Sequence, residues 1–230
     1  MACLFLFACK KEKVDPVPAP EPCILQTQNP AGRVYNDEDV TQVSYLKKCC
    51  GIIPLSVYNS WIYEDSVFND GVFVRVQYDT LRFTKTYKSQ PDDLIWWEKN
   101  NVEVGLPDML YANDSTIFLP QYRLFAPEPM MDVKKEYSLF EGDSLRYLTS
   151  FEDNAAQGRS VKLTGTISTP AGNFNDCILF EKKAPFSRTD QVIYKPGLGV
   201  VKYRSERAGY YGPPVLKVQQ VSTLIKVILQ

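Results

Sequence analysis

The chain has 230 residues, with 26 Lys and Arg against 27 Asp and Glu, so its formal net charge is −1. It has no histidine, which excludes Ser-His-Asp and Cys-His nucleophile pairs and any histidine metal ligand. Nucleic-acid-binding domains carry a clustered basic excess that is absent here, so we expect no nucleic-acid partner. With 44% hydrophobic and 23% charged residues, the composition is that of a globular protein and not of a disordered one.

The first nine residues are apolar and end in Leu6-Phe7-Ala8-Cys9. This tetrapeptide resembles the lipobox of bacterial lipoproteins, which implies that Cys9 is lipidated and becomes the first residue of the mature chain. Several acyl chains together give stable anchoring where one chain would not. Residues 1–8 contain no Lys or Arg, whereas a secretory leader has a basic region before an apolar stretch of roughly 7–15 residues. We therefore expect the leader to extend upstream of Met1. An ordinary hydrophobic N-terminus is the alternative.

Residues 10–22 read KKEKVDPVPAPEP, a composition that favours an extended, solvated tether. The predicted organisation is a truncated signal segment over residues 1–8, a lipidated cysteine and tether over 9–22, and one β-rich domain over 23–230. Such a chain belongs in the cell envelope. We expect an outer-membrane lipoprotein that faces either the periplasm or the cell exterior, attached to the membrane through its lipid.

Four cysteines remain besides Cys9 and the leader cysteine: Cys23, Cys49, Cys50 and Cys177. Export implies an oxidising compartment, in which disulfides persist. The adjacent Cys49 and Cys50 are poorly placed to bond each other, because Cα atoms in a disulfide usually lie ~4.4–6.8 Å apart. Cys23 and Cys177 could each pair with one of the two, or there are fewer bridges, with Cys23 bonded to Cys49 or Cys50 and Cys177 a small buried residue. The chain lacks a Cys-x-x-Cys spacing, so no zinc or other cofactor is expected.

One helix is predicted, over residues 37–50. Asn36 can cap its N-terminus and Gly51 can end it. Its apolar positions fall at helical spacing: Val40, Val43, Leu46 and Cys50.

Most of the remaining chain favours strands. Residues 55–63 mix β-branched and aromatic side chains, and Asn69-Asp70-Gly71 predicts a turn. The strand that follows, 72–78, places four residues on one face: Val72, Val74, Val76 and Tyr78. Further strands are predicted over 81–87, 94–98, 115–119, 136–140, 144–149, 161–169, 174–182, 191–194, 200–204 and 215–229. About ten strands and one helix predict a mainly β fold. We expect a single antiparallel, strongly curved sheet, half-barrel or barrel with one short N-terminal helix.

Two tetrapeptides match catalytic motifs but lack the companions that those motifs need. Gly142-Asp143-Ser144-Leu145 spells the GDSL signature of esterases, whose base is a histidine. Ser44-Tyr45-Leu46-Lys47 has the Ser-x-x-Lys spacing of penicillin-binding proteins without their Lys-Thr-Gly and Ser-Asp-Asn motifs. We interpret them as a turn and a surface helix, and we expect no enzyme.

Trp96-Trp97-Glu98 is the pattern most suggestive of a ligand site, because sugar sites often combine aromatic faces with a carboxylate. In an alternating strand only one of two adjacent tryptophans can face the core, so the other is exposed or covered by a loop. Core packing with one surface aromatic is therefore the competing interpretation. A second candidate is Tyr210-Tyr211, between Gly209 and Gly212 in an expected loop. The predicted ligand-binding residues are Trp96, Trp97, Tyr210 and Tyr211.

Several short sequence motifs together resemble those of uncharacterised envelope lipoproteins of Bacteroidota. They are Cys9-Lys10-Lys11-Glu12, Pro54-Leu55 with Asn59, Trp61 and Tyr63, Thr169-Pro170-Ala171-Gly172-x-Phe174-x-x-Cys177, and Tyr194-x-Pro196-Gly197-x-Gly199-x-Val201-Lys202. The resemblance implies a first strand at Trp61, a late hairpin at Pro170, and a curved antiparallel sheet that wraps a helix, as in periplasmic lipoprotein carriers. It transfers no catalytic residue.

Three functions are therefore considered. The leading hypothesis is a non-enzymatic envelope lipoprotein that binds an apolar ligand, a glycan or a protein partner, and it predicts an open cavity. A structural or assembly component predicts a filled concave face and an exposed apolar patch. A glycosidase acting through carboxylates alone requires two acids facing each other in a cleft, roughly 5–10 Å apart.

Overall fold

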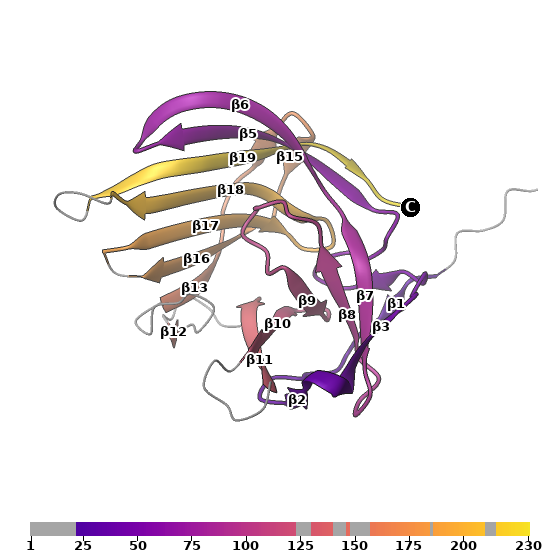
Figure 1. Ribbon diagram of the computed structural model, residues 1–230. Coiled ribbons are helices and arrows are strands. Elements are labelled where there is room, and N and C mark those ends of the chain that lie inside the picture. The colour runs from indigo at the N-terminus through magenta and orange to yellow at the C-terminus, as the bar shows by residue number, and fades with distance from the viewer. Residues whose placement is uncertain (1–21, 123–129, 140–145, 148–156, 185, 210–214) are drawn as a thin grey trace, which may run out of the picture.

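The computed structural model describes residues 22–122, 130–139, 146–147, 157–184, 186–209 and 215–230. Almost all of their regular structure is β-strand, arranged in two large antiparallel sheets (Figure 1). The prediction of a mainly β, strongly curved antiparallel fold is confirmed. The strands are shared between two large sheets, however, and do not form a single one.

The first sheet has eight strands and forms the curved upper layer of the molecule in Figure 1. In spatial order its strands are β12 (Arg146–Tyr147), β13 (Gln157–Lys162), β16 (Ile178–Ala184), β17 (Arg188–Lys195), β18 (Gly199–Ala208), β19 (Leu216–Ile228), β5 (Ser60–Asn69) and β6 (Val72–Leu81).

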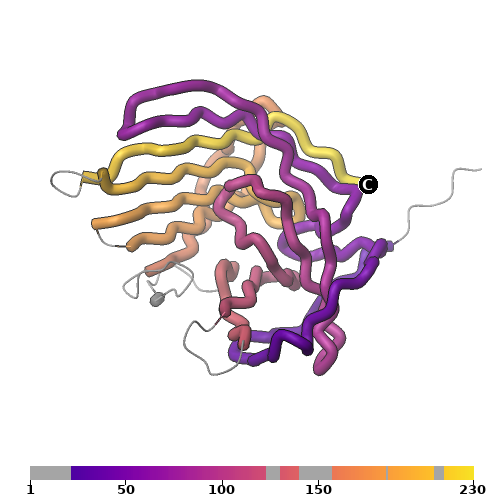
Figure 2. The backbone as a smooth tube through the Cα atoms, viewed as in Figure 1, coloured from indigo at the N-terminus to yellow at the C-terminus, as the bar shows by residue number. Residues whose placement is uncertain are grey.

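The second sheet has seven strands: β2 (Val34–Asn36), β11 (Met130–Ser138), β10 (Thr116–Tyr122), β9 (Met109–Ala112), β8 (Ile95–Lys99), β7 (Phe83–Ser89) and β3 (Val40–Val43). Two small sheets pair β1 (Ile24–Leu25) with β4 (Cys49–Cys50), and β14 (Ile167–Thr169) with β15 (Gly172–Phe174). Only Arg82 separates β6 from β7, and the backbone runs almost continuously from one large sheet into the other (Figure 2). The two large sheets are therefore joined directly through this segment.

The helix predicted over residues 37–50 is wrong beyond its first turn. Only Asp37–Asp39 is helical (η1, a 3-10 helix), and the next four residues form β3, which pairs with β7. The β-branched residues Val40, Thr41 and Val43 pack well on a pleated sheet, and this pairing overrides their helical spacing. None of the described residues forms an α-helix, so the wrapped helix that the family resemblance implied is absent from this part of the chain. Within the same residues, no helix is long and apolar enough to cross a membrane.

Two hydrophobic cores hold the sheets. The larger core lies between them and contains Trp61 and Tyr63, which are fully buried on the same face of β5. The Trp61 Nε1 donates to the Leu198 carbonyl at 2.7 Å and the Tyr63 hydroxyl donates to the Val200 carbonyl at 2.9 Å. Each aromatic therefore buries its ring and satisfies its polar end.

The smaller core lies on the other face of the seven-stranded sheet. Tyr35 of the edge strand β2 contacts Trp96 of β8 with ring centroids 6.2 Å apart. Because β2 and β8 are four places apart in the sheet order, this contact shows that the sheet curls round the smaller core.

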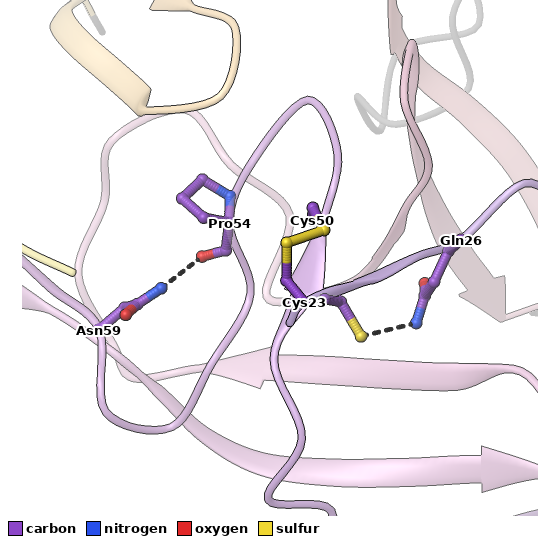
Figure 3. Close-up of a disulfide and its surroundings, with 6 residues drawn as sticks. Cys23, Gln26, Cys50, Pro54 and Asn59 are labelled. Carbon is purple, nitrogen blue, oxygen red and sulfur yellow. Dashed lines mark hydrogen bonds between the residues drawn. A yellow bond between two sulfur atoms is a disulfide. The ribbon is translucent and has the colours of Figure 1, made fainter. Parts of the chain in front are cut away.

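A disulfide and a tight turn fix the backbone at two places. Cys23 and Cys50 form a disulfide with Cα atoms 5.4 Å apart, beside the β1–β4 pair (Figure 3). Cys49 and Cys177 are buried free thiols. At the β5–β6 hairpin Asp70 and Gly71 have φ angles of 52° and 81°, which is the two-residue turn that Asp-Gly favours.

Candidate functional site

The structure places both predicted tryptophans in cores. Trp96 is 1% exposed and Trp97 is 0% exposed. Trp96 packs in the smaller core and Trp97 in the larger one, where it contacts Phe83 and Tyr45 edge-on. Because the seven-stranded sheet has a core on each face, both members of the pair are covered, and neither presents a ring to a ligand.

Other sequence candidates lie elsewhere. Cys9, the GDSL tetrapeptide at residues 142–145 and Tyr210-Tyr211 lie outside the described residues. Ser44 and Lys47 lie in the irregular segment between β3 and β4, so the expected surface helix is absent there.

A cleft of about 460 Å³ opens between the two large sheets. The seven-stranded sheet contributes residues of β9, β10 and β11, the eight-stranded sheet contributes β16 and β17, and the loop between β8 and β9 closes one side. The lining residues are Glu103, Gly105, Leu106, Pro107, Asp108, Met109, Leu119, Pro120, Tyr122, Met131, Glu136, Lys182 and Arg188. Charged side chains from opposite sheets therefore meet in this cleft.

A β-bulge brings Glu136 into the cleft. In the β10–β11 ladder Ile117 is paired with Tyr137 and Phe118 with Lys135, so Glu136 is the extra residue. A bulge re-aims the side chain at its position, and here Glu136 is 3% exposed. Its carboxylate forms an ion pair with the Lys182 ammonium of β16. The Lys182 Nζ also lies 5.3 Å from the centre of the Tyr137 ring.

A second charged cluster lies beside this pair on the eight-stranded sheet. Asp190 is fully buried and accepts a hydrogen bond from Ser205 Oγ at 2.9 Å. Arg188 forms an ion pair with it, and Arg207 reaches it at 3.5 Å. Burial raises the pKa of Asp190, and the Arg188 guanidinium opposes that rise. The strand register places Asp190 directly between Lys182 and Ser205, so these polar side chains form one row across three strands.

The loop from Asn100 to Asp108 is fixed to the sheet beneath it. A Cβ at Gly105 would lie 2.4 Å from Val192 Cγ2, and the φ of Gly105 is +77°, so only glycine fits there. The Tyr137 hydroxyl donates to the Gly105 carbonyl. At the start of the loop, the buried Lys99 ammonium donates to Asp108 at 2.7 Å and to the Val102 carbonyl at 2.9 Å. The wall of the cleft is therefore preformed.

The lining combines apolar side chains with charged side chains whose signs are nearly balanced. Its carboxylates are Glu103, Asp108 and Glu136, and its cations are Lys182 and Arg188, with Lys99 paired to Asp108 just behind. One aromatic ring, Tyr122, is 58% exposed at the rim. Among the described residues, no group of three or more His, Cys, Asp or Glu could hold a metal ion. The arrangement suits a ligand with many hydroxyl groups and no strong net charge.

Sequence reasoning missed these residues. Lys182 and Asp190 lie in strands where alternating polar residues normally face solvent, and the bulge that turns Glu136 inward leaves no mark in a single sequence. The one available signal is Gly105, because a glycine between apolar residues often marks a close approach of the backbone.

One further buried acid lies apart from the cleft, on β5. Asp65 is fully buried, and neither carboxylate oxygen has a hydrogen-bond partner among the described residues. Burial, reinforced by the neighbouring Asp79 carboxyl and opposed by Ser222, raises the pKa of Asp65 to about 7.

Comparisons with known proteins give weak likenesses. No family model matches the chain, and no curated protein matches it. One similar solved structure is a candidate lipoprotein from Parabacteroides distasonis, with 13% identity and a TM-score of 0.40, covering 78% of this chain and 99% of that one. Another is a candidate exported protein with a YmcC-like fold from Bacteroides fragilis, with 13% identity and a TM-score of 0.38, covering 79% of this chain and 100% of that one. Likeness at this level assigns neither a fold family nor a function to the chain.

Proposed function

We propose that the chain is a non-enzymatic lipoprotein of the cell envelope, anchored at the outer membrane through Cys9, that binds a neutral glycan in the cleft between its two sheets. The anchor is supported by the resemblance of Leu6-Phe7-Ala8-Cys9 to a lipobox. The binding role is supported by one observation, the preformed cleft with paired charges and an exposed Tyr122 at its rim.

The chemistry of the lining favours a glycan over the apolar ligand that was the other expectation. An apolar ligand would displace water from the exposed carboxylates of Glu103 and Asp108 without replacing its hydrogen bonds, which costs free energy. Hydroxyl groups can donate to the carboxylates and accept from the cations. A strongly anionic ligand is less suitable because carboxylates contribute as much charge to the lining as the cations do.

A purely structural or assembly role is the second candidate, and a specific observation favours it. That role predicts a filled concave face and an exposed apolar patch. The concave face of the eight-stranded sheet is largely filled by the larger core, and β6 carries exposed apolar side chains. A glycosidase is the third candidate. It is less favoured because Asp108 and Glu136 are each engaged by an ammonium group, whereas a general acid must hold a proton for the leaving group.

The test is a binding screen of the full chain, purified in detergent, against neutral and acidic oligosaccharides prepared from bacterial envelopes. Neutral oligosaccharides should bind, and Tyr122→Ala should weaken binding about tenfold, a loss of about 1.4 kcal/mol. Tyr58→Ala is the matched control, because Tyr58 is 50% exposed and lies outside the cleft. Equal loss in both variants, or binding of acidic sugars only, would contradict the proposal. Release of reducing sugar would favour the glycosidase.

A further inference from the structure

The edge of the eight-stranded sheet is unusually apolar for a free edge. β6 is its terminal strand, and among the strands of the described residues it pairs only with β5. Five large apolar side chains on it are exposed: Val72 70%, Phe73 55%, Val74 51%, Val76 44% and Tyr78 64%. Soluble proteins usually protect such an edge with lysine, proline or a short strand. β6 is ten residues long and has neither Lys nor Pro.

The hydrogen-bonding groups of this edge are ready to pair. The Thr80 carbonyl accepts a hydrogen bond from Asn100 Nδ2 at 2.7 Å, on the side of β6 away from β5. In an antiparallel ladder alternate residues point their N–H and C=O groups to the same side. Tyr78 and Val76 lie two and four residues before Thr80, so their backbone N–H and C=O groups also point to the open edge.

The two charged side chains of β6, Arg75 and Asp79, lie at equal distances along the strand from Gln77. Arg75 Nε donates to Gln77 Oε1 at 3.1 Å, and Gln77 Nε2 donates to Asp79 Oδ2 at 2.8 Å. Arg75 and Asp79 thus flank Gln77 at equal spacing on one side chain row. Within the described residues neither Arg75 nor Asp79 takes part in an ion pair, and the Asp79 carboxyl lies beside the buried Asp65 carboxyl.

We propose that β6 pairs antiparallel with β6 of a second copy of this chain, about a two-fold axis at Gln77. Val76 then lies opposite the partner's Tyr78, and the two residues exchange backbone hydrogen bonds. Arg75 lies opposite the partner's Asp79, so two equivalent ion pairs form, as a self-complementary interface requires. The exposed apolar side chains of the two strands then lie side by side across the junction, and the two eight-stranded sheets become one.

The charges favour this register over the two registers that place like charges opposite each other. An axis at Arg75 would place two guanidinium groups opposite each other, and an axis at Asp79 would do the same with two carboxylates. Like charges directly opposite destabilise a strand pair. Only the axis at Gln77 places each Arg75 opposite an Asp79.

The test is sedimentation of the full chain carrying Cys9→Ala, so that no lipid contributes to the mass. The chain should be a dimer, Arg75→Asp or Asp79→Arg should each weaken the dimer at least about tenfold, and the double reversal should restore it. Lys202→Asp, an exposed charge on β18, is the matched control and should leave the dimer intact. A monomeric chain, or a dimer that neither single reversal weakens, would overturn the proposal.

Cross-linking gives an independent readout of the register. Two side chains on the axis lie in a non-hydrogen-bonded pair, with Cα atoms ~4.5 Å apart, which is within disulfide reach. Gln77→Cys should therefore give a covalent dimer on mild oxidation, and Arg75→Cys should not. Equal cross-linking of both variants would contradict an axis at Gln77. This result does not depend on glycan binding, because β6 contributes no residue to the cleft.

Discussion

Glu136 of β11 and Lys182 of β16 form a buried ion pair that joins the two large sheets at the cleft. A buried ion pair contributes little net stability, because removing two charges from water costs free energy. Removing one partner is much more destabilising, because the other charge loses the attraction that offset its burial. The pair therefore makes the cleft sensitive to single substitutions on either sheet.

Lys182→Met should lower the free energy of unfolding by about 3–5 kcal/mol, because it removes the ammonium group that pairs with the buried Glu136 carboxylate. Adding Glu136→Gln should recover much of that loss. Urea denaturation of the two single variants and the double variant measures the coupling. Strictly additive losses would show that the two side chains do not act as a pair.

Gly105→Ala should destabilise the protein more than Gly32→Ala does. Both glycines have positive φ, +77° and +82°, but a Cβ at Gly105 meets Val192 at 2.4 Å whereas one at Gly32 meets nothing within 4 Å. Gly32→Ala should cost about 1–2 kcal/mol for its backbone conformation alone. Gly105→Ala adds an overpacking cost of about 1–3 kcal/mol. Thermal or urea unfolding distinguishes them, and equal losses would show that the loop is not tightly seated.

Asp65→Asn should change how stability depends on pH. The pKa of Asp65 is raised to about 7 in the folded protein, from an ordinary value of 3.8. Between these values the folded state binds more protons than the unfolded state, so the free energy of unfolding falls as pH rises from about 4 to about 7. Above about pH 7 the carboxyl is ionised in both states, and this contribution no longer changes with pH.

The Asn variant lacks this loss, so its stability relative to the native chain should increase from pH 4 to pH 8. Urea denaturation at several pH values measures it. Asp70→Asn, an exposed turn residue, is the control and should not reproduce the change. A constant difference between Asp65→Asn and the native chain at every pH would refute the assignment.

Removing the disulfide by Cys23→Ala with Cys50→Ala should lower the free energy of unfolding by about 3–4 kcal/mol, because the bridge closes a loop between residues 27 apart in sequence. Dithiothreitol should destabilise the native chain similarly and leave the double variant unchanged. Cys49→Ala, which removes a buried free thiol, should keep the sensitivity to dithiothreitol. Loss of that sensitivity in Cys49→Ala would mean that Cys49 forms the bridge.

The sequence predicted the β class because strand and turn signals are local. The Asp70-Gly71 turn and the shared face of Trp61 and Tyr63 are examples of such local order. Prediction from the sequence failed for segments whose conformation or exposure depends on pairing with distant strands. Val40 and Val43 have helical spacing but belong to β3, and Val76 and Tyr78 alternate like core residues but lie exposed at a sheet edge. The cleft could not be predicted, because a bulge and cross-sheet contacts bring Glu136 to Lys182.

The lipid anchor is the claim on which both the envelope location and the choice of envelope glycans depend. Intact mass of protein extracted from membranes after expression from its native locus, beside a Cys9→Ala variant, tests it most directly. We expect a chain that begins at an acylated Cys9, with the modification lost in the variant. An unmodified chain that retains Met1 would contradict the account.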